Sequence, residues 1–168
     1  MAFSNSRNIS RKAPMKGVKA IGLALFDPED LIANTGTGVI ALPASMLSVT
    51  RLEVKATGNN FVETGTFDEA TRTMEYVGVN TFFLAGNDLA LRNAVQGNDG
   101  YLQVVFIEDY NGKIYVAGSQ NGADIATVVG GSDSQGFTVT INSKEAEPAY
   151  ELGAAGITAY RAIVEAVA

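Results

Sequence analysis

The sequence predicts a mainly β (α+β) protein: an antiparallel β-barrel or sandwich with one short central helix, a long projecting β-hairpin and a C-terminal helix. Three observations support this prediction. About eight or nine strand-like runs follow one another, turn signals rich in Gly, Asn and Asp separate them, and only two stretches have helical character. At 168 residues the chain can form one domain with a substantial core. We expect an extended basic arm over residues 1–17 and a single β-barrel domain over residues 18–168.

The predicted strands before residue 60 differ in how deeply they are buried. Residues 18–26 form an apolar run of strand length that ends at the Asp27-Pro28 turn signal, and residues 37–42 form a shorter one. Residues 50–56 alternate in polarity, with Leu52 and Val54 on one face and charged side chains on the other. This alternation is typical of a strand with one buried and one solvated face.

Residues 60–84 are predicted to form a long hairpin that turns near residues 68–70. Residues 76–84 are apolar on both faces, which is typical of a strand buried between layers. Residues 63–66 and 68–73 are interpreted as polar on both faces, and such a hairpin is marginally stable alone. We therefore expect it to contact a neighbouring subunit through Asn60, Glu63, Thr66, Phe67, Asp68, Glu69, Arg72 and Glu75.

The second half of the chain begins with the short central helix. Asn87 is placed to cap a helix over residues 87–96, and Gly97 is placed for a left-handed C-terminal cap. Residues 102–107 predict a central strand, which Asn111-Gly112 joins to residues 113–117 through a type I′ turn.

Three further elements follow. Residues 123–129 and 137–141 predict strands, and residues 147–152 predict an edge strand because Pro148 cannot donate to a ladder. Residues 156–167 predict the terminal helix, whose apolar stripe comprises Ile157, Tyr160, Val164 and Val167.

Composition argues against an enzyme. The chain has no His and no Cys, which excludes His-based triads, thiol nucleophiles and the usual zinc ligands. The Gly-rich segments 118–122 and 130–133 lack the Lys-Ser/Thr of a phosphate loop. The Asp68-Glu69 carboxylates are expected to be solvated or to contact a partner. We predict no catalytic, cofactor-binding or metal-binding residues.

Charge is unevenly distributed along the chain. Residues 1–26 hold five basic residues and no acid, a net charge of +5, and the remainder holds seven basic and 18 acidic residues, a net charge of −11; the two give −6. Such an arm could bind nucleic acid. We expect instead that Arg7, Arg11, Lys12 and Lys16 dock on the acidic surface of an adjacent subunit. No secretory signal is evident, and no apolar run approaches the length of a membrane span.

The order of these elements resembles that of bacteriophage tail tube proteins, the family that shares its barrel with the tubes of contractile injection machines. The matching features are the alternating strand at residues 51–55, the ribbon at 61–84, the capped helix, and the segments 104–112, 118–123, 136–140 and 147–149. The pattern spans roughly residues 49–150 and is similar to tube-like structural proteins of phages infecting Bacteroidetes.

The resemblance implies a structural virion protein. Subunits would form sixfold rings, stacked around a channel through which DNA passes without specific binding, and would be assembled in the host cytoplasm with other tail or neck proteins. A sheet from each subunit would join its neighbours, and a long ribbon would contact the next ring. Glu53, Glu63 and Glu75 are candidates for the channel surface, because each is predicted to point away from its own core.

Three alternatives remain open from the residues. The first is another virion part with the same barrel, such as a tail terminator, a neck ring or a capsid-bound decoration. The second is a carbohydrate- or ligand-binding β-sandwich, which predicts an exposed aromatic cluster. The third is a small enzyme that uses carboxylates or Lys.

Overall fold

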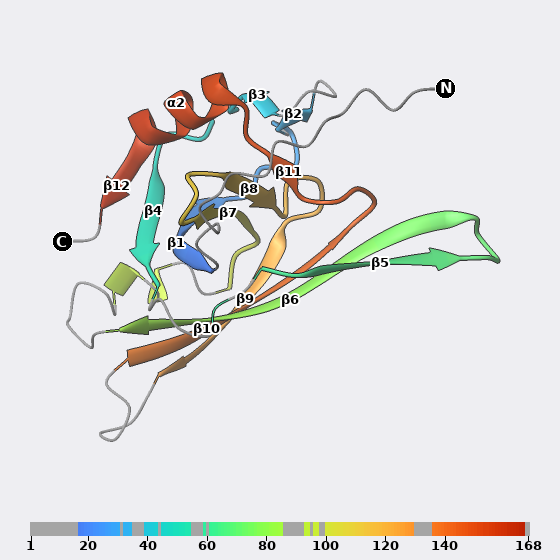
Figure 1. Cartoon of the computed structure of the whole chain (residues 1–168), viewed down its shortest axis with the longest axis horizontal. Coiled ribbons are helices and arrows are strands. Elements are labelled where there is room, and N and C mark those ends of the chain that lie inside the picture. The colour runs from blue at the N-terminus through green and yellow to red at the C-terminus, as the bar shows by residue number, and fades with distance from the viewer. Residues whose placement is uncertain are drawn as a thin grey trace, which may run out of the picture.

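The computed structural model describes residues 17–30, 32–34, 39–43, 45–54, 59, 61–85, 93–94, 96–97, 100–129 and 136–166. Ten strands form one sheet in the order β12-β4-β1-β7-β9-β10-β6-β5, with β8 on β7 and β11 on β8 (Figure 1). Nine of them are joined by antiparallel pairs, whereas β12 pairs parallel with β4. The strands are β1 Val18–Leu25, β4 Val49–Glu53, β5 Glu63–Asp68, β6 Thr73–Ala85, β7 Gln103–Asp109, β8 Ile114–Ala117, β9 Ala123–Val129, β10 Gly136–Glu145, β11 Tyr150–Glu151 and β12 Val164–Ala166.

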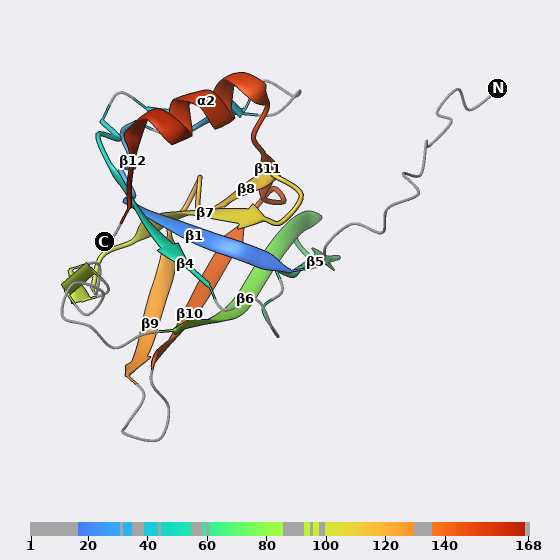
Figure 2. The same cartoon turned by 60° about the vertical axis from the view of Figure 1, so that its left-hand side comes forward.

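The sheet curls so that its two halves stack as layers. One layer contains β4, β1, β7 and β8, and the other contains β9, β10, β6 and β5 (Figure 2). The halves meet where β7 pairs with β9 through Gln103 and Ala123. Apolar side chains from both layers fill the space between them, among them Ile21, Leu52, Phe82, Val105, Phe137, Val139 and Ile141.

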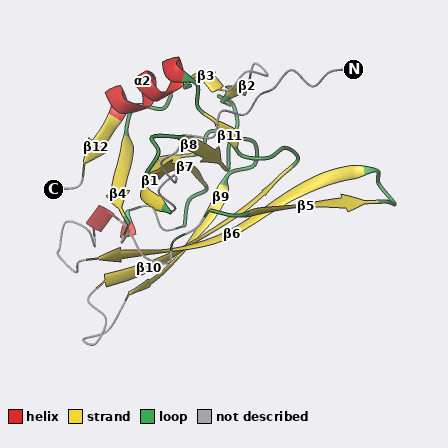
Figure 3. Ribbon diagram, in the orientation of Figure 1, coloured by secondary structure: helices red, strands yellow, loops and turns green. Residues whose placement is uncertain are grey.

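A second core lies on the other side of the first layer, beneath helix α2 (Ala154–Ile163). Tyr160 enters it from α2 and packs on Phe106 of β7, with ring centroids 4.8 Å apart. Gly22 of β1 makes this approach possible, because a Cβ there would lie 2.7 Å from the Tyr160 hydroxyl. The short strands β2 (Ala33–Asn34) and β3 (Val39–Ala41) form a separate two-stranded sheet, and Figure 3 shows them beside α2.

The structure confirms the mainly antiparallel β fold, the long projecting hairpin and the C-terminal helix. The sheet remains open and is not closed into a barrel. The helix ends at Ile163, whereas the sequence predicted helix to residue 167. The helix ends there because the next three residues form β12, which pairs with β4 from Val164↔Val49 to Ala166↔Arg51.

Two local predictions need correction. Asn93, Ala94 and Gln96 are helical, and most of the predicted central helix lies outside the described residues. Gly97 donates its N–H to the Asn93 carbonyl at 2.9 Å, but its φ is not left-handed. The β7–β8 turn is not type I′, since only Gly112 has a positive φ, of 81°. Asp109 organises this turn by accepting the N–H groups of Asn111 and Lys113, each at 2.8 Å.

Substitution of Tyr160 tests how α2 is held to the sheet. Its buried hydroxyl has no hydrogen-bond partner among the described residues, and burial raises the pKa of Tyr160 to about 12. Because the hydroxyl is unsatisfied, we expect Tyr160→Phe to leave the free energy of unfolding in urea unchanged or slightly higher. Tyr160→Ala should lower it by about 3–5 kcal/mol through the cavity that it leaves. A loss above ~1.5 kcal/mol in the Phe variant would show that the hydroxyl has a partner.

Candidate assembly surface

The arm, which we define as β5, the turn at residues 69–72 and residues 73–78 of β6, is exposed from residue 64 to residue 74. β10 pairs with β6 only as far as Glu145↔Tyr76. Beyond that point the arm is two-stranded, with the pairs Thr66↔Glu75, Phe67↔Met74 and Asp68↔Thr73. Figure 1 shows that this part projects away from the body and does not fold back on it.

The turn at the end of the arm is stabilised locally. The Asp68 carboxylate accepts the N–H groups of Ala70 at 2.8 Å and Thr71 at 3.4 Å. These hydrogen bonds lower the pKa of Asp68. Arg72 completes the reversal with a φ of 54°, an uncommon conformation for a residue other than glycine. The tip therefore has a defined shape although its side chains are exposed.

The two faces of the arm differ, which corrects the prediction that both are polar. Cross-strand register places Phe67 opposite Met74, and Gly65 opposite Tyr76, on one face. Phe67 is 54% exposed and Met74 is 41% exposed. The apolar pair could not be predicted from the sequence, because Phe67 and Met74 each stand alone between polar residues. Only the strand register shows that they lie opposite each other. The arm therefore presents an uncovered apolar pair.

Glu63 lies at the base of the arm and is half-buried. Its Oε2 accepts the N–H of Ala149 at 2.8 Å, and its Oε1 is buried without a hydrogen-bond partner among the described residues. Burial raises the pKa of Glu63, and the charge of Glu145 raises it further, although the Ala149 N–H opposes the rise. The prediction that Glu63 points away from its own core is therefore wrong.

The neighbouring Glu145 is buried and held by backbone donors. Its carboxylate accepts the N–H groups of Gly118 at 3.1 Å and Gln120 at 2.7 Å. Gly118 has a φ of 73°, and a Cβ there would lie 2.6 Å from the Gln103 carbonyl oxygen. None of the ion pairs among the described residues includes Glu63 or Glu145. Two carboxylates without a cationic partner thus meet where the arm joins the body.

The outer face of the β9-β10-β6 layer is the second exposed surface. Phe82 and Leu84 point into the core, so alternate residues of β6 such as Val79 and Thr81 point outward. Val79 is 64% exposed, and the Thr81 hydroxyl lies 3.2 Å from that of Thr140 on β10. Figure 2 shows the other strand layer on the opposite side of these strands. This face is broad and mostly uncharged.

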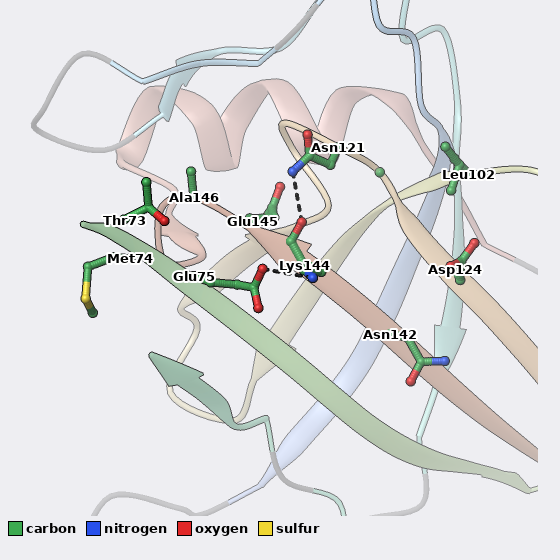
Figure 4. Close-up of a pocket in the computed structure, with 11 residues that line it drawn as sticks. Thr73, Met74, Glu75, Leu102, Asn121, Asp124, Asn142, Lys144, Glu145 and Ala146 are labelled. Carbon is green, nitrogen blue, oxygen red and sulfur yellow. Dashed lines mark hydrogen bonds and ion pairs between the residues drawn. The ribbon is translucent and has the colours of Figure 1, made fainter. Parts of the chain in front are cut away.

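An open groove of about 510 Å³ crosses one end of this face (Figure 4). Glu75 and Lys144 form an ion pair of 2.9 Å in it. The Asn121 side-chain amide donates to the Lys144 carbonyl at 2.9 Å. Leu102 and Asp124 line the groove as well. The groove is lined mainly by polar and charged side chains.

The remaining predicted residues are dispersed. Glu53 is exposed on β4 and pairs with Arg51 at 3.2 Å, while Arg51 also pairs with Glu108 at 2.8 Å. Glu75 lies on the outer face of β6, as predicted for a residue that points away from the core. Thr66, Glu69 and Arg72 are exposed on the arm. Five of the predicted interface residues lie outside the described part of the chain: Arg7, Arg11, Lys12, Lys16 and Asn60.

Comparisons with known proteins identify no relative. No protein-family model matches the chain, and neither the search of curated proteins nor the search of solved structures finds a match. Within the described residues, no helix is long and apolar enough to cross a membrane, and no group of three or more acidic side chains is placed to hold a metal ion.

Glu63→Gln tests whether the base of the arm senses pH. A raised pKa in the folded state favours the protonated carboxyl, so this stabilisation is complete below the ordinary value of 4.5 and is lost as pH rises through the raised pKa. The glutamine cannot titrate, but its carbonyl can still accept the Ala149 N–H. We expect the stability of the wild type relative to this variant to increase as pH falls from 7 toward 4.5, measured by urea unfolding.

The control for this experiment is Glu69→Gln, which removes a carboxylate from the exposed tip. If both variants show the same pH dependence relative to the wild type, Glu63 is not the group that couples stability to pH.

Proposed function

We propose that this protein is a non-enzymatic phage tail tube subunit that assembles into stacked rings around a channel for DNA. The observation that carries the proposal is the arm, whose two-stranded tip leaves the body with the apolar Phe67–Met74 pair uncovered. An isolated two-stranded hairpin is marginally stable in water. A second subunit would cover the pair and stabilise the strands at the same time.

The open sheet supports the same proposal. Among the described strands, β5 and β12 are the two ends of the sheet order, so each has one edge without a partner strand. Unpaired strand edges are templates for pairing with another chain, and a ring of identical subunits removes them. The resemblance of the sequence to tail tube proteins implies such a joining of sheets.

The mostly uncharged outer face of β9-β10-β6 is the surface that we assign to the channel. Its exposed residues include Val79, Thr81, Ala126 and Asn142, its Glu75 and Lys144 neutralise each other, and its exposed acid Asp124 repels phosphate. A surface with few free cations has little attraction for phosphate, so DNA could slide along it. Of the three glutamates predicted for the channel, Glu75 fits this assignment best, because it lies on this face.

Two changes in the arm test the proposal by negative-stain electron microscopy and analytical ultracentrifugation. Deletion of Gly65–Arg72 should leave a folded monomer that does not polymerise, because it removes the two-stranded tip. Phe67→Ser combined with Met74→Ser should raise the protein concentration needed for assembly at least ~10-fold, equivalent to about 1.4 kcal/mol of lost contact. Both side chains are exposed, so the fold should persist by circular dichroism.

The matched control is Thr64→Ser with Thr73→Ser, which changes two other exposed arm residues and keeps the apolar pair. Normal tubes from the deletion variant would contradict the role of the arm. Single rings without stacking in the wild type would favour a terminator or neck ring over a tube.

A further inference from the structure

One end of the molecule combines exposed apolar side chains with acidic side chains that form no ion pair with another described residue. β1 ends at Leu25 and β7 begins at Gln103, and these two residues are paired. Around them, Leu25 is 62%, Tyr101 64% and Leu102 44% exposed. The Phe26 N–H donates to the Leu102 carbonyl at 3.0 Å, which holds the two segments together. We call these three exposed residues, with the acids described next, the end patch.

Four acidic residues belong to the two segments that flank the apolar part of the end patch. Asp27, Glu29 and Asp30 lie in the turn after β1, and Asp124 lies at the start of β9. A Cβ on Gly122 would meet both Phe26 and Leu102, so the β9 end of the patch is in contact with the turn end. The ion pairs among the described residues include none of these four acids. Asp124 and Leu102 also line the groove of Figure 4, so the patch continues into it.

The N-terminal segment, residues 1–16, has the complementary composition. It contains Arg7, Arg11, Lys12 and Lys16, no acidic residue, and the apolar side chains of Met1, Phe3, Ile9 and Met15. Basic and apolar groups in one short segment match a surface that combines acids with exposed Leu and Tyr side chains. We propose that residues 1–16 of one subunit dock on the end patch of a second copy.

Chain length favours a second copy over the same chain. Val18 and Leu25 are the two ends of β1, which puts Leu25 about 23 Å from Val18 at ~3.3 Å per residue. Lys16 is adjacent to Gly17, and the Cα of Lys12 can lie at most about 18 Å from that of Gly17. Within one chain, Lys16 falls short of the acids beyond Leu25, and Lys12 can approach them only when the segment and its side chain are fully extended. In a second copy, all four basic residues can reach them.

This inference rests on the proposed self-assembly, because its partner is another copy of the chain.

The absence of cysteine allows a direct test by disulfide cross-linking. Ser10→Cys puts one thiol in the N-terminal segment, and Pro28→Cys puts one in the exposed turn of the patch without removing an acid. We expect oxidation of an equimolar mixture of the two single variants to give a disulfide-linked heterodimer, measured by non-reducing electrophoresis and mass spectrometry.

The control mixture pairs Ser10→Cys with Ala162→Cys, an equally single thiol on the exposed face of α2. We expect at least a fivefold lower yield from this mixture. Adding Arg11→Glu and Lys12→Glu to the Ser10→Cys variant should reduce the specific yield to the control value, and Lys19→Glu should not. The specific yield should also fall in 1 M NaCl, where the screening length is about 3 Å.

Equal yields from the two mixtures would overturn the inference. So would an intramolecular disulfide in the Ser10→Cys/Pro28→Cys double variant that forms in dilute solution in place of the intermolecular one. Electron microscopy of the same samples separates this inference from the proposed function. Tubes without the specific cross-link contradict only the docking of residues 1–16, and the cross-link without rings or tubes contradicts only the tail tube.

Discussion

The pairing of β6 with β10 is the interaction on which the proposed assembly surfaces depend. It runs from Gly136↔Ala85 to Glu145↔Tyr76, and the inward side chains along it, such as Phe82 and Val139, lie in the core between the layers. β10 ends at Glu145 while β6 begins at Thr73. The strand that helps to hold the core together therefore also carries the arm beyond the body, and the arm has a fixed direction at its base.

The base of the arm differs from the core because it buries two carboxylates, those of Glu63 and Glu145. Glu145 is satisfied by backbone N–H groups, whereas Glu63 keeps one buried oxygen without a partner among the described residues. A buried polar atom without a hydrogen bond destabilises the fold. The junction of arm and body therefore contains a destabilising feature, the buried Glu63 oxygen, whereas Phe82 farther along the same strand packs in the apolar core.

Local patterns of polar and apolar residues were enough to predict much of the fold. Leu52 and Val54 are buried while Glu53 is exposed, and the apolar run at residues 102–107 became the central strand β7. Whether the sheet closes into a barrel or stays open could not be predicted, because this depends on pairs distant in sequence, such as Gln103↔Ala123 and Val164↔Val49. These contacts are set by how the layers pack and leave no local pattern.

The candidate surface was predictable in position but not in detail. Glu63 was assigned to the wrong side because a strand without a clear apolar period does not show which way each residue points. Its orientation is set by Ala149, which is 86 residues away in the chain. The end patch was not predicted either, because Leu25, Leu102 and Asp124 come from three segments of the chain that only the folded sheet brings together.

The central claim is that the outer half of the arm depends on a second subunit for its stability. Amide hydrogen exchange followed by mass spectrometry, on dilute monomer and on assembled protein, tests this most directly. Exposed, two-stranded segments open locally at low free-energy cost, while core strands open near the global value. We predict fast exchange over residues 66–75 in the monomer, slow exchange over residues 80–84, and protection of residues 66–75 on assembly. Protection of residues 66–75 in the monomer that equals that of residues 80–84, or no change on assembly, would contradict the account.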